Sequence, residues 1–402
     1  MENEKNRLYA LALRCLAGEE SAEGLLAFLS ACDDELIRAL KEADDPETDK
    51  IWEALLRLCP MAELKNLLSL QMIVPDTRLA SPGAPRGSVA LVMHIYYADL
   101  AEYCLNYALS MPEDCDVYIT TGSAQKKEQI EAVFRRHAWH KLEVSVIENR
   151  GRDVSALLVA AAPKIMGYDT VCFVHDKRAP QIDWGIVGAA FSEHCFSNLL
   201  PTRAFVENVL ALFARQKHLG LLTPPPPIHA SYYPTLGVEW GPNYENTAAL
   251  HAQLGLRCPI SRQYEPVAPL GTMFYFRPAA LKALLERPWR YEDFPPEPNG
   301  VDGTMLHAIE RLYPYAAQDA LYYSAWVLAE KNAAAELTEL SCLLRGVKES
   351  AAPAYGTADT AALIARMDAC WRRPHSAANP ARILPYLLGK LTGSLRGEPA
   401  EE

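Results

Sequence analysis

An alternation of strand-like and helix-like segments between residues 88 and 176 constrains the fold of this chain more than any other feature. Apolar, β-branched runs at 88–97, 115–121, 142–149 and 169–176 are separated by stretches of helical periodicity at 98–112, 124–139 and 153–166. Strands and helices that alternate at this spacing form parallel βαβ units, which bind ligands at the carboxyl ends of their strands. We therefore predict an α/β protein.

Three of these predicted strands end in polar residues. The pairs are Thr120 and Thr121, Glu148 and Asn149, and His175 and Asp176. Because the carboxyl ends of parallel strands meet at one edge of a sheet, we expect a row of polar groups along that edge. The segment "VSVIENRGRDVSALLVAAAP" (144–163) is expected in the middle of it.

The segments on either side of the predicted sheet show only helical periodicity. Residues 1–79 are predicted to form a helical N-terminal domain, and the Pro- and Gly-rich stretch 80–88 is predicted to be a linker. The α/β domain is then expected to cover 89–330, and 331–402 is expected to be a helical C-terminal region.

Composition and charge exclude several classes of protein. A net charge of −11 argues against a nucleic-acid-binding protein. Ten cysteines without a C-x-x-C pair are typical of reduced, mostly buried thiols. The acidic start "MENEKNRLYA" does not resemble a secretory signal, and no apolar run reaches the ~18 residues that cross a bilayer. We expect a cytoplasmic protein.

The stretch "ENRGRD" (148–153) joins the third predicted strand to its helix. Backbone N–H groups of this turn and the guanidinium groups of Arg150 and Arg152 can meet a phosphate at the helix N-terminus. Asp153 has two interpretations. It either interacts with the helix dipole, or it holds a base, ribose or sugar hydroxyl.

The stretch "FVHDKRAP" (173–180) ends the fourth predicted strand. His175 and Asp176 can hold a divalent metal that carries a diphosphate. Alternatively, Lys177 and Arg178 neutralise the diphosphate directly. A solvated charged turn is the structural alternative.

The stretch "VDGTMLHAIERL" (301–312) predicts a helix that starts near Asp302. His307 and Arg311 are four residues apart and share one face of that helix, which is not its apolar face. Asp302 is either the N-cap of the helix or a general base at the mouth of a cleft.

Taken in order, these segments resemble the rhamnan synthesis F family of bacterial polysaccharide glycosyltransferases. The similarity covers residues 92 to about 312, and it is carried by "HIYYADLAEYCLNYA", "DVYITT", "ENRGRDVSALL", "YDTVCFVHDKR", "LGTMFYFRP" and "DGTMLHAIERL". The resemblance implies a GT-A-like nucleotide-sugar-binding fold. It also implies transfer of a deoxyhexose, typically L-rhamnose from dTDP-rhamnose, to a growing polysaccharide or a lipid-linked glycan.

The resemblance also implies roles for individual residues. Asp302 would be the base that deprotonates the acceptor, with His307 beside it. The donor would contact Thr120, Thr121, Asn149, Arg150, Arg152, Asp153, His175, Lys177, Arg178 and Arg311. Asp176 and His175 occupy the place of an Asp-x-Asp metal motif, so Mg²⁺ or Mn²⁺ is the expected cofactor. The family pattern there is closer to His-Thr-Lys-Lys-Ser, so this chain adds a carboxylate at Asp176 and lacks a hydroxyl at Ala179, two differences that bear on donor choice and metal requirement.

Two alternative functions remain open. One is a non-catalytic nucleotide-sugar- or glycan-binding subunit of a polysaccharide assembly complex, and the other is a phosphatase or nucleotidyl hydrolase that uses the same cleft.

Residues 366–396 hold six Lys or Arg against the single acid Asp368, with interleaved aromatic and aliphatic residues. Such a segment either contacts an anionic membrane surface peripherally or docks on the catalytic domain.

Overall fold

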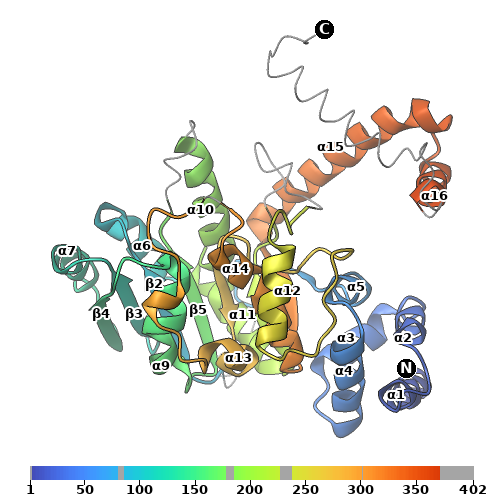
Figure 1. Ribbon diagram of the computed structural model, residues 1–402, viewed down its shortest axis with the longest axis horizontal. Coiled ribbons are helices and arrows are strands. Elements are labelled where there is room, and N and C mark those ends of the chain that lie inside the picture. The colour runs from blue at the N-terminus through green and yellow to red at the C-terminus, as the bar shows by residue number, and fades with distance from the viewer. Residues whose placement is uncertain (1, 80–85, 178–184, 227–237, 301, 372–402) are drawn as a thin grey trace. The chain divides into compact units, whose positions relative to one another are not determined.

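The computed structural model describes residues 2–79, 86–177, 185–226, 238–300 and 302–371, with side chains undescribed at 185–189 and 368–371 (Figure 1). The chain divides into two compact units, Met1–Ala334 and Ala335–Glu402. The first contains an eight-stranded sheet in the order β1-β8-β6-β7-β5-β2-β3-β4. Its strands are β1 (Gln71–Val74), β2 (Val89–His94), β3 (Asp116–Thr121), β4 (Lys141–Val146), β5 (Thr170–His175), β6 (Leu219–Thr223), β7 (Phe274–Phe276) and β8 (Tyr323–Ala329).

The predicted α/β class is confirmed by this sheet. Strands β4, β3, β2 and β5 are parallel neighbours, as the alternation predicts. Only β7 runs antiparallel, between β5 and β6. The residues just before β7 therefore lie at the same edge of the sheet as the carboxyl ends of the parallel strands.

Two details of the predicted arrangement are wrong. Residues 1–79 are not purely helical, because β1 pairs with β8 from Gln71 opposite Trp326 to Val74 opposite Ala329. A four-residue strand that depends on a partner some 250 residues away leaves too short a local pattern to recognise. In addition, β4 ends the sheet, so the segment after it starts at the side and not in the middle of the carboxyl edge.

The other regular elements of the described chain are helices. N-terminal to β2 these are α1 (Glu2–Leu16), α2 (Ala22–Leu29), α3 (Asp34–Glu42), α4 (Pro46–Leu58) and α5 (Met61–Leu67). Between β2 and β6 they are η1 (Ala98–Leu100), α6 (Ala101–Ala108), α7 (Ala124–Phe134), α8 (Arg152–Ser155), the π-helical η2 (Ala156–Ala161), α9 (Ala162–Ile165), α10 (Gly185–Leu199) and α11 (Arg203–Arg215). After β6 come α12 (Tyr244–Gln253), η4 (Pro278–Leu281), α13 (Lys282–Leu285), η5 (Tyr291–Asp293), α14 (Met305–Asp319), α15 (Glu330–Tyr355) and α16 (Thr360–Trp371).

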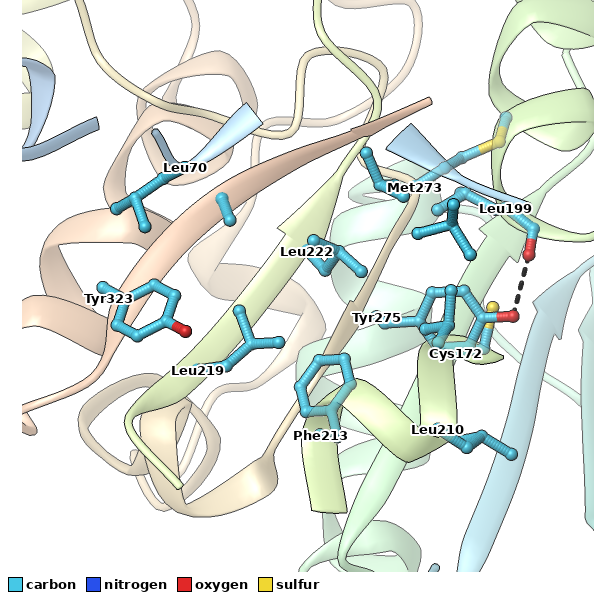
Figure 2. Close-up of a cluster of buried hydrophobic side chains, with 14 of the residues drawn as sticks. Leu70, Cys172, Leu199, Leu210, Phe213, Leu219, Leu222, Met273, Tyr275 and Tyr323 are labelled. Atoms are coloured by element: carbon cyan, nitrogen blue, oxygen red, sulfur yellow. Dashed lines mark hydrogen bonds between the residues drawn. The ribbon is translucent and has the colours of Figure 1, made fainter. Parts of the chain in front are cut away.

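The two faces of the sheet pack into two separate hydrophobic cores. In β2, Leu91 and Met93 join one core while Ala90 and Val92 join the other, because successive strand side chains point to opposite faces. The first core also contains Trp52 and the leucines of the N-terminal helices. Figure 2 shows part of this core, where the Tyr275 hydroxyl donates a hydrogen bond to the Leu199 carbonyl at 2.8 Å. The boundary between an N-terminal domain and the sheet domain stays a prediction.

The second unit contains most of α15 and all of α16. Of the basic segment 366–396, residues 372–396 lie outside the described part of the chain, so membrane contact through it stays a prediction. Among the helices that the structure describes, none combines the length and the apolar character needed to cross a membrane.

Candidate active site

Three polar side chains lie side by side at the carboxyl edge of the sheet. His94 ends β2, and the strand register places it opposite Thr120 of β3 on one side and His175 of β5 on the other. The His94 Nδ1 lies 2.9 Å from the Thr120 Oγ1. Burial and the neighbouring His175 lower the pKa of His94 to about 4, so its ring is neutral at physiological pH. Our sequence interpretation missed His94, although a single histidine near the end of an apolar strand was the available signal.

His175 and Asp176 are held by the backbone around them. The His175 Nδ1 and Nε2 lie 2.8 Å from the Asp176 carbonyl and 2.7 Å from the Gly271 carbonyl. The Asp176 carboxylate accepts hydrogen bonds from the Tyr96 and Tyr97 N–H groups at 3.0 and 2.6 Å. Burial raises the pKa of Asp176 to about 6. The pair thus ties the loop after β2 and the turn before β7 to the end of β5.

As positioned, His175 does not fit a divalent cation, because both of its ring nitrogens face carbonyl oxygens. Each Asp176 oxygen accepts one N–H group and keeps a second lone pair, so a metal at this place would have Asp176 as a ligand without His175. Within the described ranges, no group of three or more His, Cys, Asp or Glu side chains is arranged to hold a metal ion.

Two lysines lie at this edge of the sheet. The Lys177 Nζ lies 4.2 Å from the centre of the Phe191 ring, and the Lys126 Nζ lies 3.6 Å from the centre of the Tyr96 ring. Both ammonium groups are therefore held by cation–π contacts near the strand ends. The predicted donor contact Arg178 lies outside the described residues.

The turn after β4 uses its arginines to hold another segment of the chain. The Arg150 Nε and Nη2 donate to the Phe294 and Glu292 carbonyls at 2.7 and 3.0 Å. The Arg152 Nε and Nη2 form a fork with the Glu297 carboxylate at 3.0 and 3.3 Å. Both predicted phosphate contacts thus anchor residues 292–299 in this structure.

The other two predicted residues of this turn are accessible. Asn149 is exposed and Asp153 is half-buried. Burial is the largest influence on the pKa of His94, which it lowers, and on that of Tyr313, which it raises; the nearby Asp153 carboxylate opposes the first shift and adds to the second. The Asp153 carboxylate therefore belongs to the same edge of the sheet as the strand-end row.

Gly151 is required by the shape of this turn. Its φ is +84°, and a Cβ there would lie 2.8 Å from both the Phe294 ring and the Ser155 Cβ. We expect Gly151→Ala to lower the free energy of unfolding by about 2–4 kcal/mol, from left-handed strain plus overpacking. Gly167→Ala, where a Cβ would meet nothing within 4 Å, is the control and should change it by less than about 1 kcal/mol. Equal urea midpoints for the two variants would contradict this explanation.

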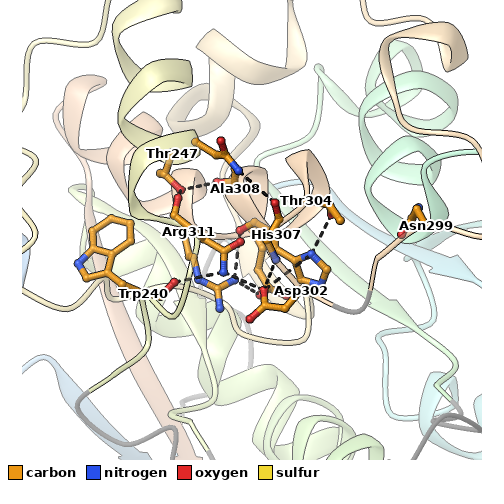
Figure 3. Close-up of polar contacts among 12 residues, drawn as sticks. Trp240, Thr247, Asn299, Asp302, Thr304, His307, Ala308 and Arg311 are labelled. Carbon is orange, nitrogen blue, oxygen red and sulfur yellow. Dashed lines mark hydrogen bonds and ion pairs between the residues drawn. The ribbon is translucent and has the colours of Figure 1, made fainter.

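The start of α14 places Asp302 at the surface of the site (Figure 3). The N-cap of α14 is Thr304, so Asp302 does not cap the helix as the alternative interpretation proposed. The Asp302 Oδ1 instead accepts hydrogen bonds from the Asn243 Nδ2 and the Gly303 N–H, both at 2.8 Å. Asn243 is fully buried, whereas the Asp302 side chain is 45% exposed. A rigid buried amide therefore orients an accessible carboxylate.

His307 lies beside Asp302. The His307 Nδ1 is 2.8 Å from the Thr304 Oγ1 and 3.9 Å from the Asp302 Oδ1. Burial lowers the pKa of His307, against the opposing effect of Glu310 and Asp302. The ring is therefore neutral at physiological pH.

A buried ion pair on α14 connects Asp302 to the strand-end row. The Glu310 Oε1 accepts a hydrogen bond from the Arg311 Nη1 at 2.9 Å. The Glu310 Oε2 accepts hydrogen bonds from the Gly271 N–H at 2.8 Å and the Thr272 Oγ1 at 3.0 Å.

Arg311 is 7% exposed and donates hydrogen bonds to the Glu239 and His307 carbonyls at 2.8 and 3.1 Å. Arg311, a predicted donor contact, is therefore a positioning residue here, and the sequence interpretation assigned no role to Glu310.

Two buried hydroxyls of this region have no hydrogen-bond partner among the residues that the structure describes. They are the Thr121 Oγ1 at the end of β3 and the Tyr313 Oη on α14. Buried polar atoms without a partner are rare in folded proteins. Both belong to elements that carry the site.

Together, the strand-end row and the exposed carboxylate define an α/β protein with a candidate ligand site at the carboxyl edge of its sheet. The chain belongs to the rhamnan synthesis protein F family, whose model matches residues 30–322. The resemblance inferred from the motifs is thereby confirmed, and the match also extends beyond them into the N-terminal helices.

Individual relatives are more distant. The protein WxcX from Xanthomonas campestris pv. campestris, described as uncharacterized, is 27% identical over 240 residues in strain B100 and equally so in strain ATCC 33913. The match covers 59% of this chain but only 32% of those relatives. A solved structure of the mannosyltransferase PcManGT from Pyrobaculum calidifontis, in complex with GDP-mannose and Mn²⁺, matches 89% of this chain and 97% of its own. At 14% identity and a TM-score of 0.33, that likeness carries no argument about function.

Proposed function

We propose that this protein is a GT-A-like glycosyltransferase that transfers a deoxyhexose, L-rhamnose from dTDP-rhamnose, to a growing polysaccharide or a lipid-linked glycan. Family membership supports the choice of chemistry. The observation that carries the proposal is the half-exposed Asp302 carboxylate, oriented by buried Asn243 and connected through α14 to the polar strand ends.

The proposed reaction is a single in-line displacement with inversion. Asp302 removes the proton of the acceptor hydroxyl as that oxygen attacks the anomeric carbon and the bond to the diphosphate breaks. His307 supports Asp302 from the adjacent turn. Thr120, Thr121, Asn149 and Asp153 form the donor pocket, because they lie at or next to the carboxyl ends of β3 and β4.

Arg150 and Arg152 support the pocket indirectly. They anchor residues 292–299 through the contacts described above, and this segment leads directly into the Asp302 loop. In this proposal their replacement disturbs the position of that loop as well as donor binding.

Acceptor-dependent turnover tests the proposal. The enzyme should consume dTDP-rhamnose faster than UDP-glucose or GDP-mannose, and an added glycan acceptor should accelerate consumption well above the rate of hydrolysis. Binding of a nucleotide sugar with no acceptor-dependent turnover would favour the non-catalytic subunit. If the protein bound none of the three nucleotide sugars, the transferase proposal would be wrong.

We expect the affinity for dTDP-rhamnose to be unchanged when EDTA replaces Mg²⁺ or Mn²⁺. The predicted metal ligands His175 and Asp176 are engaged by the backbone, and Lys177 supplies positive charge next to them. Calorimetric titration with and without EDTA measures this. A loss of affinity in EDTA would show that a divalent metal takes part in donor binding.

Lys177→Ala should weaken donor binding roughly tenfold under both conditions, as the loss of one charge-assisted contact does. Lys282→Ala is the matched control. Lys282 is 64% exposed on α13, which follows antiparallel β7 and so lies toward the opposite edge of the sheet.

A further inference from the structure

An exposed apolar stripe runs along the long helix α15 in the second compact unit. Leu337, Leu340, Leu344 and Val347 are 54%, 37%, 60% and 45% exposed, although each is a large hydrophobic residue. They follow each other at spacings of three, four and three residues, which places them on one face of the helix. This is the spacing of the a and d positions of a coiled coil.

The spacing of the apolar residues in the stripe is the same from either end of the helix. It is centred on Cys342, so that Leu337 corresponds to Val347 and Leu340 to Leu344 when the helix is reversed. Two copies of α15 that lie antiparallel therefore place apolar residue against apolar residue along the whole stripe. Each a position of one helix then faces a d position of the other, as in an antiparallel coiled coil.

The charges of the helix between residues 336 and 348 suit the same arrangement. Glu336 and Glu339 lie in the N-terminal half of this stretch, and Arg345 and Lys348 lie in its C-terminal half. Glu336 and Lys348 flank the stripe, whereas Glu339 and Arg345 lie further round the helix. A parallel pair would bring acidic half to acidic half and basic half to basic half. An antiparallel pair brings the acidic half of each helix alongside the basic half of the other, which favours this orientation.

We propose that α15 is a self-association surface, and that its stripe pairs antiparallel with α15 of a second copy of this chain. Four apolar residues a side form a small interface, so the association is weak and depends on protein concentration. The inference does not depend on the proposed transferase activity.

Sedimentation equilibrium of the full chain over a range of concentrations tests the proposal. The average mass should rise from monomer toward dimer, and Leu340→Asn/Leu344→Asn should raise the dimer dissociation constant roughly a hundredfold. The matched control is Ala335→Asn/Cys342→Asn, which changes two exposed residues off the stripe and should leave that constant unchanged. A wild-type chain that stays monomeric would overturn the proposal, as would equal dimerisation of the wild type and the stripe variant with circular dichroism unchanged.

Disulfide cross-linking tests the orientation. In a Cys342→Ser background, a mixture of Leu340→Cys and Leu344→Cys chains should cross-link faster under mild oxidation than either chain alone. Equal or faster cross-linking of each variant with itself would indicate a parallel pair and overturn the antiparallel arrangement.

Discussion

Replacing Asp302 with Asn is expected to lower the rate of sugar transfer about a thousandfold, while donor affinity stays within about twofold. General-base catalysis contributes roughly 10²–10⁴-fold, and an amide cannot take up the acceptor proton. The Asn side chain keeps the oxygen that accepts hydrogen bonds from Asn243 and Gly303, so the loop keeps its position. Initial rates with saturating donor and acceptor, together with calorimetric donor binding, measure both quantities.

Asp319→Asn is the control for this variant. Asp319 lies at the other end of the same helix, where its carboxylate accepts a hydrogen bond from the Arg257 N–H at 2.7 Å. Transfer by Asp319→Asn should equal that of the wild type. If Asp302→Asn weakened donor binding as much as it slowed transfer, Asp302 would be a donor contact and not the base.

Replacing Glu310 with Ala is expected to lower the free energy of unfolding by about 3–5 kcal/mol. The change leaves the Arg311 guanidinium buried without its carboxylate partner. Removing one partner of a buried ion pair typically destabilises a protein by about 3–5 kcal/mol. The change also removes the acceptor for the Gly271 N–H and the Thr272 Oγ1. Thr272 has a φ of +54°, an unfavourable conformation for a β-branched residue that these hydrogen bonds help to hold.

Urea unfolding measures this effect, and the exposed pair between Glu245 and Arg262 is the control. Those side chains are 76% and 62% exposed, so Glu245→Ala should lower the free energy of unfolding by at most about 1 kcal/mol. A comparable loss in both variants would show that the ion pair on α14 is not the cause. Because the Gly271 carbonyl contacts His175, we also expect Glu310→Ala to weaken donor binding, which a change in stability alone would not do.

Much of the sheet and part of the site could be predicted from the sequence. The alternation of strand-like and helix-like hydrophobic periodicity predicted β2, β3, β4 and β5. Burial on one face of a sheet or helix leaves such a repeating pattern in neighbouring residues. Polar residues at the strand ends then located the carboxyl edge, where Thr120 and His175 indeed flank β2. The turn predicted after the third strand is confirmed, and Gly151 occupies it with a φ of +84°.

The pairings of the side chains could not be predicted in the same way. Arg150 and Arg152 looked like phosphate contacts, yet they hold a segment more than 140 residues further along the chain. His175 and Asp176 looked like metal ligands, yet backbone groups engage them. A charged side chain in a sequence has many partners of similar energy, and only the packed backbone decides which one is within reach.

The sequence by itself determined the α/β class, the family and the edge of the sheet that carries the polar groups. The tertiary structure alone decided that β1 pairs with β8, that β4 closes the sheet, and that Glu310 joins the turn before β7 to Arg311. The physical reason is the range of each effect. Periodic burial is recorded in neighbouring residues, whereas strand order and buried ion pairs join segments distant in the chain and exist only after the layers have packed.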